Sequence, residues 1–195
     1  MTNKNLATIK EALTILVGTP LRDIGRSGSI LYFHFGDIVE IDDIAIGEDG
    51  RPLRDENGRG IPTKSMVGQH CLQTMLSMRL SCGNDVIFAK SDIFLPTDEL
   101  YDMENFNGAT FDWQTLGNTL FDYLLDKHFR GDFSGYIVKS VKVGKFGDLT
   151  ISFENDFALE FFADGSGYSE NWRFGETKST DSLIVTSKGI IDESH

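Results

Sequence analysis

The last third of the chain limits the fold most strongly, because it alternates short apolar segments with turn signals. The apolar segments are residues 135–144, 149–155, 157–164, 168–174 and 182–187. Turn-forming residues separate them, among them Lys145-Phe146-Gly147-Asp148, Asn155-Asp156 and a glycine-rich stretch after Asp164. Short apolar runs with such connections are typical of strands joined by tight turns. This part of the sequence therefore predicts an antiparallel meander.

Two segments nearer the N-terminus also predict strands. Residues 29–41 have apolar side chains on both faces of a strand alternation, and Gly36-Asp37 provides a turn or bulge before the pattern resumes. Residues 70–81 alternate in the same way, although some of their apolar residues also fit the spacing of a helix. A strand is favoured there because Gly83-Asn84-Asp85 and the apolar run 86–89 complete a hairpin.

Two other segments have the apolar spacing of amphipathic helices. The apolar residues that share a face are Leu6, Ile9, Leu13 and Leu16 in residues 3–17, and Leu116, Leu120 and Leu124 in residues 111–129. Asn3 or Asn5 is available to cap the first helix, and Gly18 is its stop signal. We expect the second helix to begin near Asp112 and to stop at Gly131.

The arrangement of these segments indicates the fold class. Residues 47–65 are rich in glycine, proline and charge, which predicts an exposed loop, and residues 98–107 predict an acidic loop. Helices do not alternate regularly with strands, and no repeat or linker divides the sequence. We therefore expect one α+β domain over residues 1–195, mostly antiparallel sheet with two main α-helices. Two smaller sheets on either side of residues 47–65 are the alternative.

The chain is strongly acidic, with 30 Asp and Glu residues against 18 Lys and Arg residues and a formal net charge of −12. Long-range repulsion disfavours docking on DNA, RNA or an anionic membrane, whereas a basic protein partner would be attracted. The simpler explanation is that the charge serves solubility alone. The sequence therefore predicts no nucleic-acid or membrane partner, and it leaves the oligomeric state open.

The cysteines and the apolar runs bear on location. Cys71 and Cys82 are the only cysteines and form no CxxC pattern, which fits thiols in a reducing compartment. No apolar run approaches the roughly 18 residues of a membrane helix, and the N-terminal residues do not resemble a secretion signal. We expect a soluble, cytoplasmic protein.

The stretch SENWRFG near the end of the chain combines an acid, an amide, a tryptophan and an arginine. In a regular strand Glu170 and Trp172 share one face and Arg173 lies on the other, so Glu170 and Arg173 do not face each other. On the structural interpretation, Trp172 fills the core or covers a sheet face, and Arg173 pairs with a cross-strand acid such as Glu160 or Glu154. On the functional interpretation, Glu170 and Trp172 form an exposed patch that recognises a cationic partner.

No pattern in the sequence assembles a catalytic or metal site. Cys71 follows His70, but neighbours on a strand point to opposite faces, so a buried structural thiol is the favoured interpretation. Residues 55–60 resemble part of a calcium loop, yet Arg59 and Met66 occupy positions that need oxygen ligands. Zinc spacing, a P-loop, a dinucleotide fingerprint and a GxSxG motif are lacking. We therefore expect no catalytic residue, cofactor or metal.

Four segments resemble a group of uncharacterised bacterial proteins. They are LVGTPLRDIGRSGSILYFHFG, MLSMRLS, SDIFLP and GDLTISFENDFALEFFADGSGYSENWRF, and the resemblance covers most of the chain. The group has an arginine on a central strand and an E-x-W-R stretch near the end, although Met78-Arg79 stands where the group has Trp-Arg. Some members resemble immunity proteins of contact-dependent or polymorphic toxin systems. The resemblance implies inhibition by binding and carries over no catalytic residue.

These observations favour an acidic binding protein, with inhibition of a basic toxin enzyme as its specific form. The candidate binding residues are Asp42, Asp43, Asp98, Glu99, Glu170, Trp172, Arg173 and Arg79, with Glu48, Asp102 and Glu104 as further exposed acids. The alternative is an enzyme or small-ligand domain whose pocket lies between sheet and helices and uses Arg79, Arg173, Glu170 or His70. A structural subunit that forms a homo-oligomer is a third interpretation.

Overall fold

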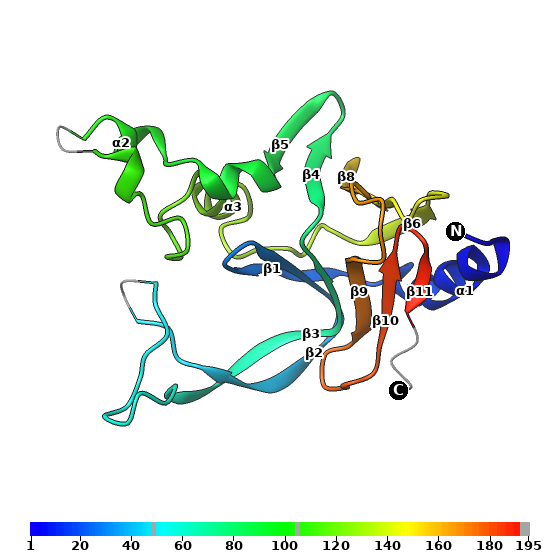
Figure 1. The fold of residues 1–195 in the computed structure, drawn as a ribbon, viewed down its shortest axis with the longest axis horizontal. Coiled ribbons are helices and arrows are strands. Elements are labelled where there is room, and N and C mark those ends of the chain that lie inside the picture. Colours follow the sequence, from blue (N-terminus) through cyan, green and yellow to red (C-terminus); the bar gives the residue numbers. More distant parts are fainter. Residues whose placement is uncertain (48–49, 104–105, 192–195) are drawn as a thin grey trace.

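The computed structural model describes residues 1–47, 50–103 and 106–191, and the strands among them form two antiparallel sheets (Figure 1). The six-stranded sheet contains, in spatial order, β1 (Leu21–Ser27), β2 (Ile30–Ile44), β3 (Pro62–Thr74), β9 (Glu170–Glu176), β10 (Ser182–Thr186) and β11 (Gly189–Ile191). The five-stranded sheet contains β5 (Asp85–Ala89), β4 (Ser77–Cys82), β8 (Phe157–Phe162), β7 (Leu149–Phe153) and β6 (Val138–Val143).

Helices lie at the margins of the sheets. The two longer ones are α1 (Asn3–Leu13), which continues into the 3-10 turn η1 (Thr14–Leu16), and α3 (Leu120–Phe129). The short ones are η2 (Lys90–Phe94), α2 (Asp98–Tyr101) and η3 (Gly108–Thr110). The predicted mixture of antiparallel sheet and two main α-helices is therefore confirmed. Within the described ranges, none of the helices has the length and apolar character that crossing a membrane requires.

The predicted C-terminal meander is divided between the two sheets. β6, β7 and β8 are neighbours in the five-stranded sheet, whereas β9, β10 and β11 are neighbours in the six-stranded sheet. The chain changes sheet between β8 and β9, and earlier between β3 and β4. Residues 47–65 do not separate the sheets, because their last four residues, 62–65, are not loop but belong to β3 and pair with residues 41–44 of β2.

A shared hydrophobic core joins the sheets to both longer helices. Ile9 of α1, Phe33 of β2, Phe121 of α3 and Phe161 of β8 are all buried in it. Phe33 and Phe161 meet edge to face, with ring centroids 5.2 Å apart. Backbone hydrogen bonds between residues 18–21 and 136–138 connect the β1 edge of one sheet to the β6 edge of the other. The two sheets therefore face each other across this core and are linked at one edge.

The first helix differs from the prediction in its cap and in its last turn, because the α-helix ends at Leu13 and the 3-10 turn η1 follows it. Thr2 caps α1, since its Oγ1 accepts a hydrogen bond from the Asn5 N–H at 3.2 Å, so Asn3 and Asn5 already belong to the helix. Gly18 follows η1 with φ of +82°, a left-handed conformation that glycine adopts without strain. The predicted stop is therefore confirmed.

The second helix begins later than predicted. Thr119 and Asp122 form a capping box that starts α3 at Leu120. Asp112, the predicted start, instead folds a turn: it accepts hydrogen bonds from the Gln114 N–H at 3.1 Å and from the Thr115 hydroxyl at 2.8 Å. The expected helix start was wrong because a side chain suited to capping a helix caps a turn equally well.

Beyond the six-stranded sheet, β2 and β3 continue as a projecting hairpin, which we call the arm (residues 38–47 and 50–68; Figure 1). Among the described residues, no other strand pairs with the arm. The pairing of β1 with β2 ends at Phe35, and the pairing of β9 with β3 begins at His70. A bulge at Gly36-Asp37 separates the arm from the sheet, since pairing passes from Phe35–His70 to Ile38–Gly68. A Cβ on Gly68 would lie 2.6 Å from the Phe35 backbone nitrogen, so this crossing needs glycine.

Candidate functional site

The outer face of the six-stranded sheet continues into the inner face of the arm. On β1 and β2, Asp23, Tyr32 and His34 point outward, away from the core. The bulge adds one residue to β2. Beyond it, odd-numbered residues of β2, such as Ile41 and Asp43, therefore point to the same face as Tyr32 and His34. A hollow of about 670 Å³ follows this face, and we call it the arm groove.

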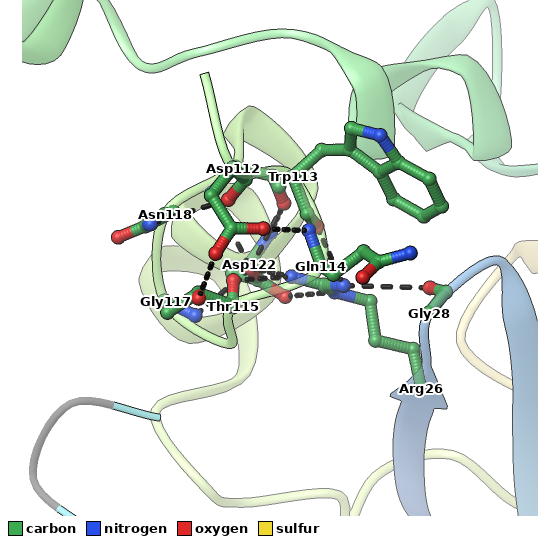
Figure 2. Close-up of polar contacts among 10 residues, drawn as sticks. Arg26, Gly28, Asp112, Trp113, Gln114, Thr115, Gly117, Asn118 and Asp122 are labelled. Atoms are coloured by element: carbon green, nitrogen blue, oxygen red, sulfur yellow. Dashed lines mark hydrogen bonds and ion pairs between the residues drawn. The ribbon is translucent and has the colours of Figure 1, made fainter. Parts of the chain in front are cut away.

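The opposite wall of the arm groove is the loop of residues 112–118, which contributes Gln114 and Leu116. Arg26 of β1 fixes this loop to the sheet (Figure 2). The Arg26 side chain is 1% exposed, and its Nε and Nη2 donate to the Asp122 carboxylate at 2.7 and 2.6 Å. Its Nη1 and Nη2 also donate to two backbone carbonyls of the loop. Because this guanidinium is both buried and paired, it holds the wall in one position.

The tip of the arm touches the same loop, which closes the arm groove into an arch. Arg51 Nη2 donates to Asp112 Oδ2 at 2.8 Å. Gly50 lies so close to the loop that a Cβ on it would overlap the Leu116 carbonyl oxygen. The side chains of Arg51 and Asp112 are 64% and 40% exposed, and an exposed pair of this kind contributes little by itself. Arg51 Nε also donates to the Thr115 hydroxyl at 3.3 Å, so more than one contact joins the arm to the loop.

Two carboxylates face the arm groove without a lysine or arginine side chain beside them. Asp23 is half-exposed at one end, and Asp43 lies on the arm, where its carboxylate accepts hydrogen bonds from the Ile44 N–H and the Ser65 hydroxyl. Among the described residues, no lysine or arginine nitrogen lies within 4.0 Å of either carboxylate. The groove therefore has a negative electrostatic character.

His34 lies beside Asp23 and does not offset its charge at neutral pH. Its Nδ1 is buried, is 4.0 Å from Asp23 Oδ2, and has no hydrogen-bond partner in the part of the chain that the structure describes. Burial lowers the pKa of His34, and the nearby Asp23 opposes that change only in part. The imidazole is therefore neutral at neutral pH.

The SENWRFG stretch forms β9, but it is not a regular strand. The pairing with β10 passes from Val185–Trp172 to Thr186–Glu170, so Asn171 is an extra residue in a bulge. The bulge brings Glu170 to the face of Arg173, whose Nε and Nη2 donate to the Glu170 carboxylate at 2.8 and 2.6 Å. The expectation that Glu170 and Arg173 do not face each other was wrong for this reason.

Trp172 lies in the core, as the structural interpretation of this stretch expected. Its side chain is fully buried, and its Nε1 donates to the Gly147 carbonyl at 2.8 Å. The exposed Glu170–Trp172 patch is therefore not formed. The expected partner Glu160 pairs instead with Arg79 on the neighbouring strand β4, at 2.7 and 3.1 Å.

The exposed acids lie in two regions. Asp42 is on the outer face of the arm, opposite to Asp43, and forms an ion pair with Lys64 that lowers the pKa of the Asp42 carboxyl. Asp98 and Glu99 occupy the first turn of α2, a favourable place for negative side chains. Asp102 follows that helix and is also exposed. Glu48 and Glu104 lie outside the described residues.

The residues proposed for the enzymatic alternative do not gather in one pocket. Arg79 belongs to the five-stranded sheet, Arg173 and Glu170 lie on the outer face of the other sheet, and His70 is buried against Phe174. Arg173 lines a separate hollow of about 450 Å³ that adjoins the arm groove.

The geometry also gives no support to a cysteine nucleophile at Cys71 or to a metal site among the described residues. Burial, followed by the Asp23 charge, raises the pKa of Cys71 to about 12, so this side chain is a thiol at neutral pH. In the described ranges no group of three or more His, Cys, Asp or Glu side chains is arranged to hold a metal ion.

Sequence reasoning did not single out Asp23, because it left residues 21–27 as a connection. Arg26, on the same strand, is a buried anchor of the groove wall. The signal that could have identified β1 is the Gly28-Ser29 turn, in which Gly28 has φ of +56° and joins β1 to β2 as a tight hairpin.

A scan of protein-family models finds no match to this chain, and neither does a search of curated proteins or of solved structures.

Proposed function

We propose that this protein binds a basic protein partner and acts by occupying it. The observation that carries the proposal is the uneven placement of charge in the fold. Residues 37–112 contain 15 of the 30 acidic residues and only 6 of the 18 basic ones. They include the arm and α2, which project on the same side of the molecule (Figure 1). A cationic surface would be attracted to this side more than to any other.

Exposed apolar side chains accompany the acids on the arm. The exposed fractions of Met66, Ile38 and Ile46 are 64%, 54% and 49%. Apolar side chains within a polar rim are typical of protein interfaces. A two-stranded hairpin is marginally stable in water, so a surface that covers the arm would also stabilise it. These features support a protein partner over a role of the charge in solubility alone.

The specific form that we propose is an inhibitor of a basic toxin enzyme. This step rests on the resemblance of the four sequence segments to immunity-like bacterial proteins. An acidic face suits inhibition by binding, because electrostatic attraction accelerates encounter with a cationic enzyme and the bound protein then blocks access of the substrate.

The experiment is to capture the partner at low ionic strength, identify it, and measure association rates with two triple variants. The first removes the acids of α2 and its C-cap, which lie on the side of the molecule that carries the arm: Asp98→Asn, Glu99→Gln and Asp102→Asn. The second removes the same charge elsewhere: Asp126→Asn, Glu154→Gln and Asp156→Asn. We expect the first to slow association several-fold and the second to change it less than about twofold. Equal effects of the two variants would contradict the proposal.

A small-ligand function is the second candidate, because the arm groove, at about 670 Å³, has the size of a ligand pocket. A thermal-shift screen with metabolites, nucleotides and metal ions tests it. Reproducible stabilisation by one compound, lost on substitution of a groove residue, would favour this candidate.

A further inference from the structure

We propose that the arm groove binds an extended basic segment of the partner, with cationic side chains at Asp23 and Asp43 and apolar side chains between them. The inference rests on the proposed function and adds the place and the conformation of the bound group. Its occupant is a linear peptide segment, in contrast to the folded surface that the acids around α2 would attract.

The length of the arm groove suits an extended chain. His34, beside Asp23, and Asp43 are both on β2 and both line the groove. They are nine positions apart in the sequence, which in a strand of about 3.3 Å per residue is roughly 25–30 Å. An extended segment of about seven residues, with a long basic side chain at each end, spans such a distance.

The ends and the middle of the arm groove differ in chemistry. Asp23 and Asp43 supply negative charge at the ends, and neither has a lysine or arginine neighbour among the described residues. Tyr32, on the strand next to Asp23, also lines the groove, and an aromatic ring attracts a cation. Ile41 and Val67 form an apolar floor between the ends. Cationic side chains at both ends with apolar side chains between them complement this pattern.

The arch over the arm groove selects a linear occupant. The Arg51–Asp112 ion pair, the Arg51–Thr115 hydrogen bond and the close approach of Gly50 to Leu116 join the arm to the loop across the groove. A folded domain does not fit beneath such a connection, whereas a tail or loop enters from an end.

The test uses a capped peptide, Lys-Ser-Val-Ser-Val-Ser-Lys, whose lysines and valines share one face when it is extended. Its affinity is measured by calorimetry for the wild type and for two double variants. Asp23→Asn with Asp43→Asn removes both groove charges. Asp42→Asn with Asp85→Asn is the matched control, because Asp42 is the neighbour of Asp43 on the opposite face of the arm and Asp85 lies at the β5 edge. We expect the groove variant to bind about tenfold or more weakly and the control to bind like the wild type.

The outcomes separate this inference from the proposed function. Equal binding by both double variants, or no binding by the wild type, overturns the inference. If the captured partner then still shows charge-dependent association, the proposed function stands without it. A second readout is the NMR signal of the His34 imidazole, which we expect to shift when the lysine peptide is added and not when its lysines are replaced by glutamate. Circular dichroism of each variant confirms that it is folded.

Discussion

At the residue scale, the Arg26–Asp122 pair is the main support of the arm groove wall. Because the Arg26 side chain is 1% exposed, Arg26→Ala leaves Asp122 Oδ1 and two loop carbonyls without the donor that Arg26 supplies, while Asp122 Oδ2 keeps its Gly117 and Thr119 donors. Breaking a buried pair in this way costs about 3–5 kcal/mol. We expect a loss of that size in the free energy of unfolding from urea denaturation.

The control for this prediction is Arg79→Ala, which removes a similar bidentate pair on a more exposed surface. The Arg79 and Glu160 side chains are 43% and 24% exposed, so we expect a much smaller loss of stability than in Arg26→Ala. Similar losses in the two variants would show that Arg26 does not anchor the loop as the structure indicates.

The histidines set the response to mild acid. Burial lowers the pKa of His34, His70 and His128 from the ordinary value of 6.5. The unfolded chain keeps the ordinary pKa, so as the pH falls it takes up protons that the folded protein does not. The stability that the neutral, buried histidines contribute is therefore fully present above pH 6.5. It is lost as the pH falls toward the pKa values that they have in the folded protein.

We accordingly expect the urea midpoint to fall between about pH 7.5 and about pH 5.5, and to fall less in His34→Gln than in the wild type. The measurement is a series of urea denaturations at fixed ionic strength. A midpoint that rises on acidification, or a variant that loses as much stability as the wild type, contradicts the assignment of a buried neutral His34.

At the element scale, strand periodicity predicted most of the sheet but not its irregularities. Alternation identified β2, the hairpin of β4 and β5, and the C-terminal strands. The sequence did not predict how the bulges at Gly36-Asp37 and at Asn171 change side-chain directions. One extra residue in a strand turns all the side chains that follow it to the opposite face of the sheet. That reversal pairs Glu170 with Arg173 and brings Asp43 to the face of His34.

The arm groove could not be predicted from the sequence for a related reason. Its carboxylates come from β1 and from the arm, and its wall comes from a loop some 90 residues away from β1 in sequence, as the contacts of Arg26 with residues 113–122 show. Local patterns identify such elements one by one, whereas their meeting depends on how the two sheets pack.

Gly68 tests the geometry of the arm. A Cβ there would meet the Phe35 backbone at 2.6 Å, so Gly68→Ala forces β2 and β3 apart at the bulge. We expect it to lower the free energy of unfolding by about 1–3 kcal/mol, as overpacked sites do. Gly165→Ala is the control, since its Cβ would meet nothing closer than 4.0 Å, and we expect a change within about 0.5 kcal/mol. Equal stability of the two variants would contradict the tight crossing.

At the scale of the whole molecule, the sequence predicted the sign of the charge but not its position. Residues 37–112, which include the arm and α2, contain 15 of the 30 acidic residues and 6 of the 18 basic ones, and exposed apolar side chains lie on the arm. Solubility alone would not need the acids on one side. The account therefore depends on whether this side attracts a cationic partner.

The most direct test is the association rate constant of the captured partner, measured as ionic strength is raised from low to physiological. Electrostatic attraction between an acidic face and a basic surface predicts a steep fall in that rate constant, with a smaller change in the dissociation rate. An association rate that does not change with salt would contradict the account.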